Sequence, residues 1–105
     1  QINEKGELKA SHAYIYFLLG KTALAESQHN LAIEYFEKSL TVSTEFKDAD
    51  GISQAHEGLS VAYFEQNDLV KAKQSVELAL EYTPPYISDR TFGFAQILAI
   101  RRLNI

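Results

Sequence analysis

Histidine, cysteine and carboxylate side chains are the groups in this sequence that could catalyse a reaction or bind a metal. The sequence has three histidines and no cysteine, and His12, His29 and His56 do not show the spacing of a metal site. No Ser-His-Asp order, nucleophile elbow or glycine-rich phosphate loop is recognisable. We therefore expect a protein that is not an enzyme and that has no cofactor and no metal.

Two pairs of acidic residues, Glu34 with Glu37 and Asp48 with Asp50, are the remaining candidates for acid-base chemistry. Acidic residues are common on helix surfaces and in turns, so we interpret both pairs as surface residues, with a catalytic pair as the minor alternative. His56 stands at a position that calls for a large packing residue, and we interpret it as part of the core.

The charge balance restricts the class of partner. The sequence has ten Lys and Arg residues and 14 Asp and Glu residues, which gives a net charge of −4. A weakly acidic chain is a poor match for phosphate backbones. The longest apolar run, residues 14–20, is shorter than the roughly 20 residues of a membrane-spanning helix. We expect no direct nucleic-acid binding by this segment, no membrane insertion and a cytoplasmic location.

Apolar residues recur at helical spacing along the whole chain, as at Ala32, Phe36 and Leu40. Asp68 is a good residue to begin a helix, and Pro84 is a residue at which a helix ends. Short connections between such helices make consecutive helices antiparallel. We predict an all-α fold with five helices, over residues 8–26, 29–46, 52–66, 69–82 and 89–103.

One pattern of residues occurs twice, forty residues apart (59 − 19 and 72 − 32). The first copy consists of Tyr16, Leu19, Gly20, Ala23, Ala32, Phe36, Ser39 and Leu40. The second copy consists of His56, Leu59, Ser60, Tyr63, Ala72, Val76, Ala79, Leu80 and Pro84. Small residues at Gly20 and Ser60 allow the two helices of a hairpin to cross closely, whereas Phe36 and Val76 fill the space between one repeat and the next.

The pattern resembles the tetratricopeptide repeat over residues 14–84, with Tyr16 and His56 in place of the usual Trp. The resemblance implies a right-handed superhelix of antiparallel helix pairs, with about two repeats and an additional C-terminal helix. The period of 40 exceeds the usual 34 and is similar to that of bacterial Rap/PlcR-type or MalT-like regulators. We place the six extra residues around residues 42–49.

The resemblance also implies the domain organisation. We expect a single helical domain over residues 1–105, which is a fragment of a longer protein. Its parts are a first repeat over residues 13–46, a second repeat over 53–84 and a final helix over 86–105.

In such repeats the first helix of each pair lines a concave groove that holds a protein or peptide. Matching positions give the predicted groove residues Tyr14, Phe17, Leu18, Lys21, Leu24, Gln54, Glu57, Val61, Phe64 and Glu65. Lys21 is the only basic residue among them, which argues against capture of a C-terminal carboxylate. The expected function is an adaptor or scaffold that binds a protein partner. The alternative is a peptide-sensing regulatory domain of a bacterial transcription regulator or signalling protein, and in either case another part of the same chain could fill the groove.

The predicted last helix has almost no polar face, as Phe92, Phe94, Ile97 and Leu98 illustrate. Such a helix must be buried on more than one side. We expect it to continue into a further repeat or to form a homo-oligomer interface, unless it folds back over the groove. Arg101 and Arg102 complement the dipole at the end of this helix rather than forming a nucleic-acid patch.

Overall fold

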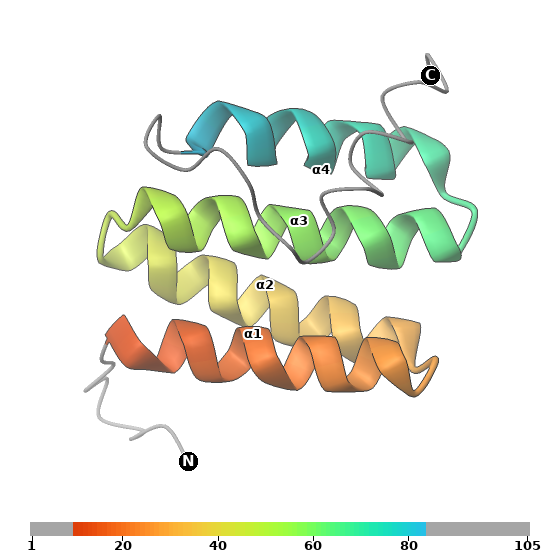
Figure 1. Cartoon of the computed structure of the whole chain (residues 1–105), viewed down its shortest axis with the longest axis horizontal. Coiled ribbons are helices and arrows are strands. Elements are labelled where there is room, and N and C mark those ends of the chain that lie inside the picture. Colours follow the sequence, from red (N-terminus) through yellow and green to blue (C-terminus); the bar gives the residue numbers. More distant parts are fainter. Residues whose placement is uncertain (1–9, 84–105) are drawn as a thin grey trace.

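Four α-helices form the part of the chain that the computed structural model describes, residues 10–83. They are α1 (Ala10–Ala25), α2 (His29–Glu45), α3 (Ala49–Glu65) and α4 (Leu69–Tyr82). No strand occurs within residues 10–83, so the all-α prediction is confirmed. The helices follow one another across the molecule from α1 at one edge to α4 at the other (Figure 1). The helix predicted over residues 89–103 lies outside the described residues.

Three turns of the same form join the helices. Their central residues, Ser27, Lys47 and Asn67, have φ values of 62°, 53° and 65°, in the left-handed region that closes helix C-termini. At each turn a backbone amide donates a hydrogen bond to the carbonyl oxygen of the residue five positions earlier. The donor–acceptor pairs are Gln28–Ala23 (2.8 Å), Asp48–Ser43 (2.9 Å) and Asp68–Tyr63 (2.9 Å). The turn residues are 20 apart (47 − 27 and 67 − 47). The period of 40 therefore consists of two equal helix-and-turn units.

The third helix begins at Ala49 rather than at residue 52, so the predicted connection over residues 47–51 was wrong. Asp48 accepts a hydrogen bond from the Gly51 amide at 3.1 Å, and a carboxylate in this position starts a helix. The six residues by which the period exceeds 34 are also not confined to residues 42–49. Because the three turns are equally spaced, each helix-and-turn unit has 20 residues instead of the roughly 17 that are half of the usual repeat.

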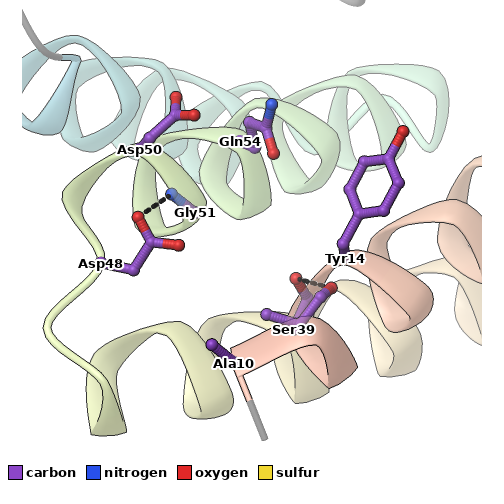
Figure 2. Close-up of a pocket in the computed structure, with 8 residues that line it drawn as sticks. Ala10, Tyr14, Ser39, Asp48, Asp50, Gly51 and Gln54 are labelled. Atoms are coloured by element: carbon purple, nitrogen blue, oxygen red, sulfur yellow. Dashed lines mark hydrogen bonds between the residues drawn. The ribbon is translucent and has the colours of Figure 1, made fainter.

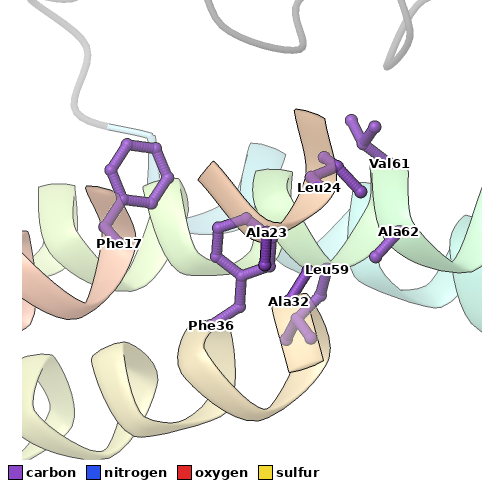
Figure 3. Packing of buried hydrophobic residues seen from close by; sticks show 8 residues of the cluster. All are labelled: Phe17, Ala23, Leu24, Ala32, Phe36, Leu59, Val61 and Ala62. Atoms are coloured by element: carbon purple, nitrogen blue, oxygen red, sulfur yellow. The ribbon is translucent and has the colours of Figure 1, made fainter. Parts of the chain in front are cut away.

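The ring of Phe36 on α2 lies between α1 and α3 and is fully buried. A Cβ atom at Gly20 of α1 would lie 2.6 Å from this ring, and one at Gly58 of α3 would lie closer still. Both distances are shorter than any van der Waals contact, so the ring occupies space that only glycine leaves open. Figure 3 shows Phe36 among the surrounding core residues. The prediction that Phe36 fills the space between the two repeats is confirmed.

Ser60, predicted as the small residue at the helix crossing of the second repeat, is buried and donates its hydroxyl to the carbonyl oxygen of Glu57 at 2.6 Å. Gly58 of α3, which is not part of the predicted repeat pattern, is the glycine that lies against Phe36 of α2. A second core cluster, of Ala72, Val76 and Ala79 on α4, has all three residues fully buried. The second repeat therefore has a core with smaller side chains than the first.

Candidate functional site

The predicted groove residues differ widely in exposure. Tyr14, Leu18 and Glu65 are exposed, Lys21, Gln54 and Phe64 are partly exposed, and Phe17, Leu24, Glu57 and Val61 are buried. The structure therefore does not present these residues as one continuous surface.

Phe17, Leu24 and Val61 belong to the hydrophobic core cluster shown in Figure 3. The ring of Phe17 lies 5.8 Å from that of Phe36, centroid to centroid, and 5% of the residue is exposed. This face of α1 packs against α2, which is why the ring is covered. The three apolar residues are core residues, and their side chains are not open to a partner.

A cavity of about 260 Å³ lies between the beginning of α1 and the beginning of α3 (Figure 2). Its lining residues are Ala10, Ala13, Tyr14, Ser39, Asp48, Asp50, Gly51 and Gln54. Tyr14 and Gln54 are both predicted groove residues and occupy equivalent positions of the two repeats (54 − 14 = 40). The cavity is therefore where the structure brings the two halves of the predicted groove together.

The lining of the cavity has an excess of negative charge. Asp48 and Asp50 supply two carboxylates, and none of the lining residues that the structure describes is a Lys or Arg. One oxygen of Asp48 accepts the hydrogen bond from the Gly51 amide. The N-terminus of α3 adds a positive dipole end, but this amounts to only about half an elementary charge. The balance favours a hydrogen-bond donor or a cation as ligand.

Tyr14 is the exposed end of a row of aromatic rings. Its ring stacks on that of Phe17 with centroids 6.4 Å apart, and Phe17 in turn contacts Phe36 in the core. The Tyr14 residue itself is 57% exposed. An exposed aromatic side chain supported from behind loses little conformational entropy on binding, which suits it to anchor a partner.

Other predicted groove residues lie away from this cavity. Glu65 ends α3 and pairs with His29 on α2 at 2.9 Å, beside a 2.8 Å hydrogen bond from Gln66 to Asn30. Gln54 and Glu65 are separated by roughly 16 Å along the helix axis. Glu65 therefore contributes to the junction between α2 and α3 and does not line the cavity.

Sequence reasoning missed most of the cavity lining, including Ser39, Asp48, Asp50 and Gly51. Asp48 was recognisable as a helix-starting residue, and that signal would have placed the beginning of α3 beside α1.

His56 is partly buried, and burial lowers its pKa from the ordinary value of 6.5. Within residues 10–83, no group of three or more His, Cys, Asp or Glu residues could hold a metal ion.

Antiparallel hairpins of nearly equal length, stacked through small residues, define a helical-repeat protein. A family model described as tetratricopeptide repeat matches residues 11–83. The chain therefore belongs to the tetratricopeptide repeat family, whose members act as protein-interaction modules. Comparison with curated proteins and with solved structures gave no significant match. None of the helices within the described part of the chain is long and apolar enough to cross a membrane.

Proposed function

We propose that this module acts as an adaptor or scaffold that binds a segment of a protein partner along α1 and α3. One side chain of the bound segment enters the cavity beside Tyr14. The observation that carries the proposal is that equivalent residues of the two repeats, Tyr14 and Gln54, line this one cavity. The Gln54 amide can bind the backbone of the segment, and the Tyr14 ring can pack against its anchor side chain.

The size and charge of the cavity indicate the chemistry of that anchor. Its volume of about 260 Å³ lies below the roughly 300–1,000 Å³ of pockets for small organic ligands, and it suits a single side chain. Asp48 and Asp50 favour a Lys or Arg side chain, which forms charge-assisted hydrogen bonds with carboxylates and can lie against the Tyr14 ring. A C-terminal carboxylate is disfavoured, because Lys21 is the only Lys or Arg of α1 and α3.

Selection of random peptides displayed on phage against the full chain tests this proposal. We expect the selected peptides to share one Lys or Arg at a fixed position. Binding of a selected peptide should weaken at least about tenfold in Tyr14→Ala, which corresponds to an anchor residue. Tyr82→Ala is the matched control, because Tyr82 is an exposed tyrosine of α4 that does not line the cavity.

Equal effects of Tyr14→Ala and Tyr82→Ala on peptide binding would contradict the proposed site. Selected peptides with an acidic anchor, or peptides whose binding is indifferent to replacement of their Lys or Arg, would contradict the proposed chemistry. Thermal unfolding of both variants shows whether loss of binding has a structural cause. Neither tyrosine is buried, so we expect both variants to remain folded.

A further inference from the structure

The chain leaves α4 beside the cavity. Thr83, the last described residue, follows α4, and its hydroxyl oxygen lies 2.9 Å from that of Ser53 on α3. Gln54, the next residue of α3, lines the cavity. The end of α4 and the beginnings of α1 and α3 lie at one end of the molecule (Figure 1). The segment after Thr83 therefore starts within one helix diameter, roughly 10 Å, of the cavity.

The C-terminal segment, which we define as residues 84–105, has a charge opposite to that of the helices. It has three arginines, which are all the arginines of the chain, and one aspartate, so its net charge is +2 (3 − 1). Residues 10–83 have five lysines and 11 Asp and Glu residues, so their net charge is −6 (5 − 11). Complementary charges of this kind favour contact between the C-terminal segment and the helices of the same chain.

The cavity has the groups that an arginine side chain binds. Asp48 and Asp50 contribute carboxylates, and Gln54 contributes a side-chain carbonyl. A guanidinium group has five N–H donors in one plane and can bind a carboxylate through two of them. The same plane stacks on aromatic rings, and the exposed Tyr14 lines the cavity. An arginine therefore matches both the charge and the aromatic wall of the cavity.

Arg90 is the arginine that follows α4 most closely. It lies seven residues after Thr83 (90 − 83), and seven extended residues span up to about 23 Å, more than the distance to the cavity. Arg101 and Arg102 lie 18 and 19 residues after Thr83, and a longer loop costs more entropy to close. A short linker also gives a tethered side chain an effective concentration in the millimolar range. Arg90 is therefore the intramolecular ligand that the cavity would bind most readily.

We propose that Arg90 of the same chain occupies the cavity beside Tyr14 in the absence of a partner, and that a Lys or Arg of the partner must displace it. This inference rests on the proposed function, because both use the same cavity. It adds regulation to that function. The module binds only those segments whose further contacts along α1 and α3 outweigh the loss of its own arginine.

NMR spectra of the full chain test the position of Arg90 without any partner. The probes are the side-chain amide of Gln54 and the backbone amide of Gly51, since both residues line the cavity. We expect Arg90→Gln to shift both signals. Arg101→Gln is the matched control, because it removes the same charge from the same segment, and it should leave both signals in place. Unchanged signals in Arg90→Gln, or equal shifts in the two variants, would overturn the proposal.

A synthetic peptide of residues 84–96, which contains Arg90, measures the competition. It should bind the Arg90→Gln chain and return the Gln54 and Gly51 signals towards their positions in the natural chain. The natural chain should bind this peptide about tenfold more weakly, because its own Arg90 competes. Equal affinities would overturn the proposal. A shift of the natural spectrum towards that of Arg90→Gln on dilution would show that a second copy supplies Arg90, which would also overturn it.

The inference about Arg90 and the proposed adaptor function fail in different ways. If no phage-selected peptide binds through Tyr14 even in the Arg90→Gln chain, the adaptor function is wrong, and the Gln54 and Gly51 signals still decide where Arg90 lies. If selected peptides bind through Tyr14 but Arg90→Gln changes neither these signals nor the affinity, the adaptor function stands and the occupation of the cavity by Arg90 is wrong.

Discussion

The hydroxyl of Ser39 on α2 donates a hydrogen bond of 2.8 Å to the carbonyl oxygen of Ala13 on α1. Forty residues further on, the same two positions are joined with their roles exchanged. Ser53, the equivalent of Ala13, donates to the carbonyl oxygen of Ala79, the equivalent of Ser39, at 2.8 Å. Both serines are buried. Each hairpin is thus closed, at the end away from its turn, by one buried hydrogen bond between its two helices.

Ser39→Ala and Ser53→Ala should each lower the free energy of unfolding by about 1 kcal/mol, because each removes one buried hydrogen bond between two helices. Ser53→Ala also removes the hydrogen bond of 2.9 Å between the Ser53 and Thr83 hydroxyls. Urea denaturation measures the change. Thr41→Ala is the control, since the Thr41 hydroxyl is exposed and donates within its own helix to the carbonyl oxygen of Glu37. We expect this control to differ from the natural protein by less than about 0.5 kcal/mol. Serine variants as stable as Thr41→Ala would show that the bonds contribute nothing.

Lys47→Gly should raise the free energy of unfolding by about 0.5–1 kcal/mol. Lys47 has φ of 53°, a conformation that costs a side-chain-bearing residue roughly 1–2 kcal/mol, and the flexibility of glycine in the unfolded chain offsets part of the gain. Asn67→Gly, at φ of 65°, should change stability less, because asparagine adopts this conformation more readily. Thermal unfolding of both variants tests whether Lys47→Gly stabilises the protein more than Asn67→Gly does. A larger stabilisation by Asn67→Gly would contradict the prediction.

Gln28→Asp should stabilise the protein by about 0.5–1 kcal/mol through a new cap on α2. The three turns end in equivalent residues, Gln28, Asp48 and Asp68. The two aspartates accept hydrogen bonds from backbone amides at 3.1 and 3.3 Å, whereas Gln28 makes no such bond. Chemical denaturation measures the gain, with Asp48→Ala as the opposite change that should cost about 1 kcal/mol. A Gln28→Asp variant less stable than the natural protein would contradict the interpretation of residue 28 as the N-terminal capping position of α2.

The stability of the fold should depend on pH through His56. Burial lowers the pKa of His56 from 6.5, so the folded state prefers the neutral imidazole. Below pH 6.5 the unfolded chain binds a proton that the folded chain does not, and the free energy of unfolding therefore falls as the pH falls towards the folded pKa. His56→Gln should remove this contribution. Denaturation at about pH 7.5 and about pH 5.5 tests whether stability falls more in the natural protein than in the variant; equal falls would contradict the prediction.

The spacing of apolar residues predicted the helices well, because α2 and α4 each have one apolar face. Ala32 and Phe36, or Ala72 and Val76, repeat at the helical period and are fully buried. The same reasoning could not orient α1, because its apolar residues surround the helix. Leu18 and Phe17 are neighbours in sequence, yet one is 41% and the other 5% exposed. Only the packing of α1 against the Phe36 ring decides which of them is covered.

The cavity could not be predicted for a different reason. Its lining combines the beginning of α1, Ser39 near the end of α2 and the beginning of α3. These segments come together only because α3 begins at Ala49, three residues earlier than the apolar pattern indicated. Asp48 determines that start through its hydrogen bond to the Gly51 amide. An error of less than one helical turn was therefore enough to miss Asp48, Asp50 and Gly51 in the lining.

The packing of Phe36 between Gly20 and Gly58 holds α1 and α3 on either side of α2, and it thereby creates the surface that we propose binds a partner. The most direct test measures the free energy of unfolding of Gly58→Ala, with Phe36 present and with Phe36→Leu. With Phe36 present, we predict that Gly58→Ala destabilises the protein by about 1–3 kcal/mol, because the new methyl group overlaps with the ring. In the Phe36→Leu protein the same change should be neutral or stabilising by up to about 1 kcal/mol, as alanine favours helix over glycine. Stabilisation by Gly58→Ala with Phe36 in place, or the same cost in both proteins, would contradict the account.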